Sequence, residues 1–128
     1  MIKLLNMGCG MRGIKAIKAD VKVVTLDINP EVRPDVVHDL NMHPLPFEDE
    51  EFDEIMALDV LEHIGKQGDY RFFFAEFSEY WRILKDRGLF HGSVPIENDK
   101  WAWGDPGHTR IFSKQYLTYL DQRQYTSR

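Results

Sequence analysis

Apolar residues along the chain gather in short runs that turn-forming residues separate. The first run, residues 2–7, leads directly into Gly8, Gly10 and Gly13, which is the pattern of a buried strand entering a glycine-rich turn. Further strands are predicted where β-branched and apolar residues cluster between turn residues, at 23–26, 36–37, 52–58 and 89–95. The connections between these runs are short.

The clearest helical pattern follows Asp69, a predicted N-cap. Apolar residues recur there at intervals of four, three and four, and a glycine lies just beyond the predicted end: Phe73, Phe77, Tyr80, Leu84 and Gly88. Shorter helices are predicted at 14–21, 60–64 and 113–120, the last with Ser113 as its cap. Residues 43–51 and 96–109 are predicted to be loops. Trp101 and Trp103 in the second loop are expected to pack over the sheet edge, with capping of an acceptor or stacking on a sugar or base as the alternatives.

Strands that alternate with helices or short crossovers predict an α/β fold. We expect a Rossmann-like, mostly parallel sheet of about five strands with flanking helices on both faces, forming a single domain over residues 1–128. A chain of 128 residues is long enough for one hydrophobic core without disulfides or structural metals.

Composition and charge narrow the class of protein. Hydrophobic residues make up 43% and charged residues 29%, as in ordinary globular proteins, and the formal net charge of −5 gives no general attraction to nucleic acid. Cys9 is the only cysteine, and no apolar run has the roughly 20 residues of a membrane span. We therefore expect a cytoplasmic protein that binds neither nucleic acid nor membranes.

The five histidines do not show the close spacing of metal ligands. They are scattered along the chain, at His38, His43, His63, His91 and His108. Because zinc sites usually show paired ligands a few residues apart, we predict no dedicated metal site.

Candidate ligand-binding residues follow the predicted strands. In open parallel sheets, ligands bind beyond the carboxyl ends of the strands, near the point where the strand order reverses. Gly8 and Gly10 follow the first strand, where the backbone can approach a ligand closely. A tight turn with a purely structural role is the alternative interpretation of these glycines.

Carboxylates follow the next three strands. Asp27 ends the second strand and can accept hydrogen bonds from a ribose diol, although segment 27–30 is also a plausible Asx turn. Asp39 with Leu40 follows the third strand, where an acid can accept the amine of adenine beside an apolar ring contact. Leu58 and Asp59 end the fourth strand. Asp59 is expected either to face the end of the ligand opposite the adenine, where an amino acid portion would lie, or to act as an N-cap of the turn at 60–64.

These motifs together resemble class I S-adenosylmethionine-dependent methyltransferases of the type 11 kind. The resemblance covers 4–10 (LLNMGCG), 24–28 (VTLDI), 39–55, 59–64 (DVLEHI) and 84–89 (LKDRGL). The short crossovers and 104–113 (GDPGHTRIFS) resemble small bacterial and phage forms found near sugar and lipopolysaccharide biosynthesis genes.

The resemblance implies S-adenosylmethionine as cofactor and a set of contact residues. These are Asn6, Gly8, Cys9, Gly10, Asp27, Ile28, Asp39, Leu40, Leu58 and Asp59. Asn6 stands where the family more often has an acid, and Asp86-Arg87 replaces Pro-Gly in the family's turn. The family's sheet has further strands in a final hairpin, so we expect a truncated fold whose exposed fifth strand is covered by a second copy or a further segment.

The resemblance also implies a reaction, which is methyl transfer to an acceptor that no residue identifies, such as a small molecule or saccharide. His63, His108 and Asp59 are the candidate proton acceptors, with a structural role as the alternative for His63. A catalytically inactive binding or assembly module is the alternative function. A dinucleotide oxidoreductase is disfavoured because few residues after Gly13 remain for a full crossover helix.

Overall fold

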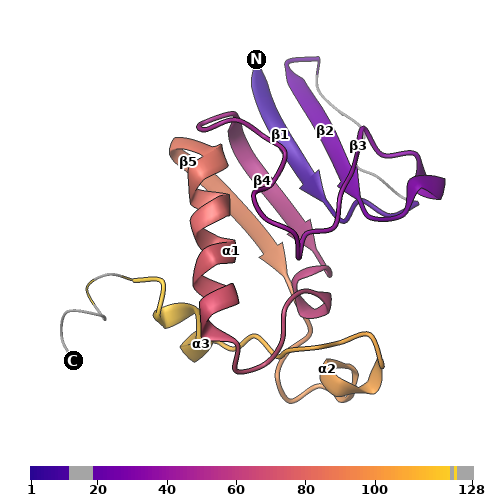
Figure 1. The fold of residues 1–128 in the computed structure, drawn as a ribbon, viewed down its shortest axis with the longest axis vertical. Helices are drawn as coiled ribbons and strands as arrows, with labels where there is room; N and C mark the ends of the chain where they lie inside the picture. The colour runs from indigo at the N-terminus through magenta and orange to yellow at the C-terminus, as the bar shows by residue number, and fades with distance from the viewer. Residues whose placement is uncertain (12–18, 122, 124–128) are drawn as a thin grey trace.

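The computed structural model describes residues 1–11, 19–121 and 123, and it contains one five-stranded sheet (Figure 1). The strand order is β3-β2-β1-β4-β5, and all four pairings are parallel. The strands are β1 (Ile2–Met7), β2 (Val21–Asp27), β3 (Val36–Val37), β4 (Phe52–Leu58) and β5 (Leu84–Ser93). The α/β, Rossmann-like class predicted from the sequence is confirmed.

The central strand β1 is buried on both faces. Residues 4–7 of this strand are all buried, and successive strand residues point to opposite faces of a sheet. Leu5 and Met7 join the main hydrophobic core together with Leu26 of β2 and Ile55 of β4. The apolar run at the start of the sequence therefore forms the middle of the sheet, as predicted.

Parallel pairing brings the carboxyl ends of the strands to one edge. Met7 lies opposite Leu26, Asp27 opposite Val37, and Leu58 opposite Ser93. In Figure 1 the strand arrows point toward the end of the molecule where the short helix α2 (Lys100–Gly104) lies. Residues that directly follow β1, β2 and β4 are thereby brought together.

The long helix α1 (Tyr70–Ile83) packs beside β4 and β5 on one face of the sheet (Figure 1). Asp69 caps it as predicted, because its side chain accepts a hydrogen bond from the backbone N–H of Phe72 at 3.1 Å. Phe73, Tyr80 and Ile83 are its buried apolar residues. The helical periodicity in the sequence thus identified the face that meets the core.

The end of α1 and the start of β5 differ from the prediction. Leu84 was expected in the helix, but its backbone is extended and it pairs with Phe52 as the first residue of β5. Between Phe52 and Glu54 the register shifts, so that Glu54 pairs with Leu89. Arg87, not Gly88, takes the left-handed conformation in this irregular stretch, with φ of 61°. Hydrogen bonding to β4 therefore overrides the helical pattern at Leu84.

The remaining short elements are η1 (Pro30–Val32), η2 (Leu61–His63) and α3 (Lys114–Thr118). Element η2 confirms the predicted helical turn at 60–64, and Ser113 caps α3 by accepting from the N–H of Tyr116 at 3.1 Å. The predicted loop at 96–109 contains α2, which Asp99 caps. Most of the predicted helix at 14–21 lies outside the described residues. No helix within the described ranges is long and apolar enough to cross a membrane.

Candidate functional site

A hollow of about 250 Å³ opens at the carboxyl edge of the sheet. Its walls come from the residues that follow β1, β2, β3 and β4, and they include six of the predicted contact residues and His63. The lining residues are Gly8, Leu26, Asp27, Ile28, His38, Asp39, Leu40, Asn41, Asp59, Val60, His63 and Ile64. The reversal of strand order between β1 and β4 thus places the hollow where open α/β sheets bind ligands.

The glycine loop is held against the end of β2. The N–H groups of Gly8 and Cys9 both donate to the carbonyl oxygen of Leu26, at 2.8 and 3.2 Å. Gly8 has φ of 66°, and a Cβ atom there would lie 2.5 Å from Cγ2 of Val60. Glycine is therefore required at this position by both backbone conformation and space.

Asp27 links the loop to the turn after β2. Its Oδ2 accepts a hydrogen bond from the N–H of Gly10 at 2.9 Å, and its Oδ1 accepts one from Asn29 at 2.9 Å. The Asx turn considered for segment 27–30 is therefore present, and the same carboxylate lines the hollow. Each carboxylate oxygen has a further lone pair with which to accept a ligand hydroxyl.

Asp39 and Leu40 form a polar and an apolar part of the wall. Asp39 Oδ1 accepts from the backbone N–H and side-chain amide of Asn41, at 2.9 and 3.1 Å. Leu40 is buried in the core, whereas Ile28, which also lines the hollow, is exposed. An acid beside two apolar side chains matches the amine edge and ring faces of a purine.

Asp59 lies in the left-handed conformation at the end of β4, with φ of 53°. Its N–H donates to the carbonyl oxygen of Ser93 at 2.9 Å, and Ser93 Oγ donates to its Oδ1 at 3.2 Å. The alternative role as N-cap is wrong, because Val60 occupies the cap position of η2 and no side chain caps it. Contacts with β5 therefore orient Asp59 at the hollow.

Other predicted contact residues lie near the hollow rather than in its described wall. Asn6 is buried within β1, and Leu58 is 46% exposed. Cys9 is half-buried next to Gly8. Burial, followed by the negative charges of Asp27 and Asp35, raises the pKa of the Cys9 thiol.

His63 and His108, 45 positions apart in the chain, lie side by side with ring centroids 4.6 Å apart. His63 Nδ1 lies 3.0 Å from the carbonyl oxygen of Gly107, and His108 Nδ1 lies 3.1 Å from that of Ala102. Glu62, which the sequence did not single out, lies beside them with its Oε1 3.8 Å from His63 Nε2. Burial raises the pKa of the Glu62 carboxyl. Because His108 lies far from Glu62 and His63 in the sequence, local spacing did not predict this cluster.

A buried ion pair fixes the segment that carries His108. Arg110 donates through two nitrogens to the two carboxylate oxygens of Glu76 on α1, at 2.8 and 2.7 Å, and through Nε to the carbonyl oxygen of Leu61 at 2.9 Å. The hydroxyl of Tyr80 donates to the same carboxylate at 2.8 Å. Sequence reasoning missed this pair, although Glu76 lies on the apolar stripe of α1, between Phe73 and Tyr80.

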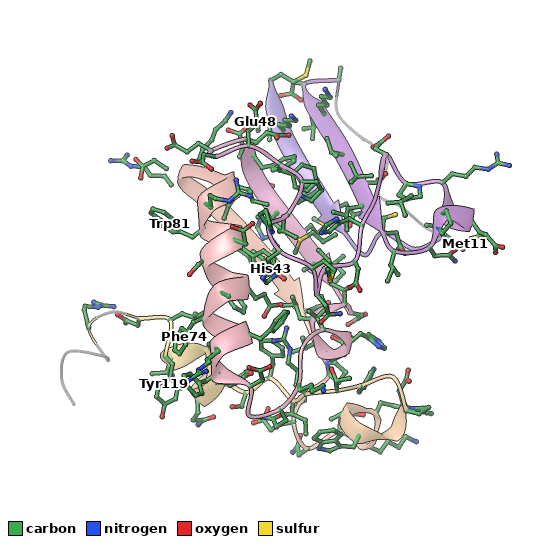
Figure 2. The ribbon with its side chains drawn as sticks, viewed as in Figure 1. Met11, His43, Glu48, Phe74, Trp81 and Tyr119 are labelled. Carbon is green, nitrogen blue, oxygen red and sulfur yellow. The ribbon has the colours of Figure 1, made fainter. Side chains whose placement is uncertain are left out.

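The exposed indole rings of Trp101 and Trp103 on α2 contradict the expectation that they pack over the sheet. A second hollow, of about 320 Å³, is lined by Gly68, Tyr70, Phe73, Phe74, Tyr116 and Tyr119. Figure 2 shows Phe74 and Tyr119 near one another between α1 and α3. This aromatic hollow holds none of the predicted site residues.

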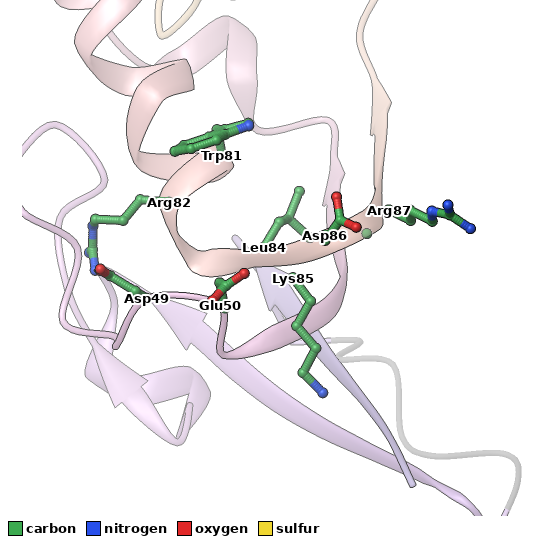
Figure 3. A pocket seen from close by; sticks show the side chains of 9 residues that line it. Asp49, Glu50, Trp81, Arg82, Leu84, Lys85, Asp86 and Arg87 are labelled. Atoms are coloured by element: carbon green, nitrogen blue, oxygen red, sulfur yellow. The ribbon is translucent and has the colours of Figure 1, made fainter.

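A third hollow, of about 410 Å³, lies at the opposite edge of the sheet, where β5 begins (Figure 3). Charged side chains surround it, including Glu50, Lys85 and Arg87, and Arg82 is paired with Asp49 at 2.9 Å. No predicted contact residue lies there. Its position at the amino ends of the strands separates it from the glycine loop.

A glycine loop and carboxylates at the reversal point of a parallel sheet are the arrangement that Rossmann-like proteins place at their ligand sites. The sequence pattern of the methyltransferase domain matches residues 5–91, more than half of the chain. The protein belongs to this methyltransferase family, which confirms the resemblance seen in the sequence.

Solved structures show the same fold. A SAM-dependent methyltransferase from Archaeoglobus fulgidus matches with a TM-score of 0.74 at 18% identity, over 97% of this chain and 59% of that one. A complex between the Haloferax volcanii Trm112 methyltransferase activator and a protein described as a methyltransferase matches with a TM-score of 0.67 at 20% identity, over 91% and 58% of the two chains. The PH0226 protein from Pyrococcus horikoshii OT3 matches with a TM-score of 0.52 at 25% identity, over 69% and 46%.

The chain thus spans less than two thirds of the length of each of these solved chains. No curated protein matches its sequence significantly. Membership of the methyltransferase family favours a methyltransferase over the inactive module considered from the sequence.

Proposed function

We propose that this protein transfers a methyl group from S-adenosylmethionine, which binds in the hollow beside the glycine loop. The single observation that carries the proposal is the convergence of Gly8, Asp27, Asp39 and Asp59 on one hollow. The donor set fits this cofactor: Asp27 for the ribose diol, Asp39 with Leu40 for adenine, and Asp59 for the amino acid portion. Asn6, Cys9, Gly10, Ile28 and Leu58 are proposed to complete the contacts.

When bound, S-adenosylmethionine supplies an electrophilic methyl group on a sulfonium. The protein's own contribution is to hold the acceptor in line with that methyl and to exclude water. Gly8 is proposed to let the cofactor approach the backbone of the loop closely, because this residue has no side chain. A side chain at this position would also collide with Val60. Positioning is therefore the main proposed source of rate enhancement.

The proposed proton acceptors are His63, His108 and Asp59. His63 and Asp59 line the hollow directly, and His108 contacts His63. A group beside the acceptor can remove its proton as the new bond to carbon forms. The acceptor is proposed to be a small molecule or saccharide, on the support of the net charge of −5 and the exposed Trp101 and Trp103 rings.

We further propose that β5 pairs with a second copy of the chain. In the part of the chain that the structure describes, β5 pairs with β4 alone, and Leu89 on it is exposed. An uncovered edge strand is a template for pairing with another strand. Light scattering should therefore show a dimer, which Leu89→Lys weakens; a monomer at high protein concentration overturns this assembly.

The cofactor proposal is tested by calorimetry with S-adenosylhomocysteine, the demethylated product. We expect micromolar binding to the unmodified protein and none to Asp27→Ala. Asp27→Asn retains one oxygen acceptor but loses the charge, so it should bind about 10- to 100-fold more weakly. Glu31→Ala removes an exposed acid of η1 and serves as the matched control. The absence of heat at millimolar ligand contradicts the proposal.

A further inference from the structure

Three potential metal ligands meet at the border of the proposed cofactor hollow. Glu62 and His63 come from η2, and His108 comes from the segment after α2. One ligand atom from each side chain lies within 4.8 Å of the other two. We propose that Glu62, His63 and His108 bind a divalent transition-metal ion, with Zn²⁺ as the best match.

Both imidazole rings are oriented as metal ligands are. Each Nδ1 lies within hydrogen-bond distance of a backbone carbonyl oxygen, that of Gly107 for His63 and that of Ala102 for His108. A carbonyl oxygen can only accept, so each Nδ1 must carry the hydrogen. The Nε2 lone pair of each ring is then available to a metal, which is the arrangement that a backbone carbonyl hydrogen-bonded to the other ring nitrogen imposes on zinc-binding histidines.

Glu62 supplies an independent observation. The residue is only 3% exposed, and its Oε2 has no hydrogen-bond partner among the described residues. A buried carboxylate oxygen without a partner is costly, and a cation next to it removes that cost. Its other oxygen, Oε1, lies 3.8 Å from His63 Nε2, so the carboxylate group borders the space between the ligands.

Asp105 is a further acid near the cluster. Asp105 Oδ2 is 3.7 Å from His108 Nε2, beyond hydrogen-bond distance. Its Oδ1 already accepts from the N–H of Gly107 at 2.7 Å, and this bond shapes the turn before His108. We therefore assign Asp105 to the support of the loop rather than to the metal.

Two imidazole nitrogens and one carboxylate oxygen form the ligand set of open zinc sites. Bonds of about 2.0–2.2 Å place tetrahedral zinc ligands roughly 3.3–3.6 Å apart, so the side chains need to close by about 1 Å. His63 is partly exposed and can rotate to do so. The fourth position remains open for an oxygen of a ligand.

The location of the cluster indicates a role for that open position. His63 belongs to the wall of the hollow that also contains Asp59 and Asp27. An acceptor oxygen bound to the metal would be oriented beside the methyl donor and would lose its proton more readily. This role rests on the proposed function, whereas metal binding itself does not. The proposal replaces the expectation of no metal site, which relied on spacing along the chain.

Zinc binding to the metal-stripped full chain tests the proposal directly. A chromophoric chelator in competition should report one zinc ion per chain, and cobalt substitution should produce the visible absorption of a tetrahedral site. Glu62→Gln and His108→Asn should each weaken zinc binding by at least about 100-fold and abolish the cobalt absorption.

His91→Asn is the matched control. His91 Nε2 lies 3.7 Å from Glu54 Oε2, a histidine–carboxylate pair at nearly the same distance as in the cluster but outside it. Zinc affinity should be unchanged in this variant. Circular dichroism verifies that each variant is folded, and Glu62→Gln preserves the shape of the side chain if His108→Asn fails to fold.

Two results overturn the metal site: less than one zinc ion per chain at micromolar concentrations, or equal affinities in the native protein and Glu62→Gln. Calorimetry with S-adenosylhomocysteine on the same metal-free sample separates this inference from the proposed function. Binding of S-adenosylhomocysteine without binding of zinc refutes the metal site alone. Binding of zinc without binding of S-adenosylhomocysteine supports the metal site and contradicts the cofactor proposal.

Discussion

Arg110 and Glu76 form a two-point ion pair in which both side chains are completely buried. The pair joins α1 to the segment that follows α2, and a third hydrogen bond from Arg110 reaches Leu61 at the start of η2. Through these contacts the pair holds in place both segments that contribute the cluster of Glu62, His63 and His108. A buried pair 34 positions apart in the chain thus organises the border of the site.

Removing one member of this pair should strongly destabilise the protein. Arg110→Ala leaves the Glu76 carboxylate buried without its cation, at a cost of about 3–5 kcal/mol in the free energy of unfolding. Arg110→Lys should recover little of this, because an ammonium group cannot make the same planar pair of hydrogen bonds. Urea denaturation measures both changes. Arg71→Ala, on the exposed face of the same helix, should remain near the native value.

Arg87 offers a stabilising substitution. Its φ of 61° places a side-chain-bearing residue in the left-handed region, which costs about 1–2 kcal/mol for residues other than glycine. Arg87→Gly should therefore stabilise the protein by about 1 kcal/mol, after the greater freedom of glycine in the unfolded chain is counted. Thermal unfolding should show a higher midpoint; a lower midpoint would mean that the arginine side chain makes compensating contacts.

The pH dependence of stability should include a contribution from Glu79. Its carboxylate accepts from Arg82 at 2.8 Å and from the N–H of Leu45 at 2.7 Å. The hydrogen bond from Arg82, more than any other contact, lowers the pKa of Glu79. A carboxyl with a lowered pKa in the folded state stabilises above its ordinary pKa of about 4.3 and loses that stabilisation as the pH falls.

Glu79→Gln should consequently be less stable than the native protein by about 1 kcal/mol at neutral pH. The difference should shrink as the pH is lowered below about 5, because the native carboxylate becomes protonated. Denaturation at a series of pH values measures this convergence. A difference that stays constant down to pH 3 would argue against the charge as its origin.

Cys9 provides a probe of the glycine loop. Burial and the nearby charges of Asp27 and Asp35 raise the pKa of its thiol, and alkylation requires the thiolate. Iodoacetamide should therefore modify Cys9 several-fold more slowly than a free thiol at pH 8, and S-adenosylhomocysteine should slow it further. As Cys9 is the only cysteine, mass spectrometry reports this site alone. Rapid modification in the unliganded protein would contradict the raised pKa.

Local patterns were enough to predict much of the architecture. The apolar run at 2–7, the capping residues Asp69 and Ser113, and the helical spacing from Phe73 to Tyr80 all have their predicted roles. These predictions succeeded because a strand between two covered faces and a capped amphipathic helix each depend on neighbouring residues. The prediction failed at Leu84, where pairing with the distant Phe52 competes with helix continuation.

The sequence by itself determined the class of the fold, the glycine loop and the acids that follow the strands, because parallel pairing sends all strand ends to one edge. Only the tertiary structure decided which distant groups meet there. Glu76 and Arg110, which are completely buried, and likewise His63 and His108 come together from different segments, and the chemistry of each pair depends on this proximity. Burial and proximity are properties of the packed chain, so no local pattern could reveal them.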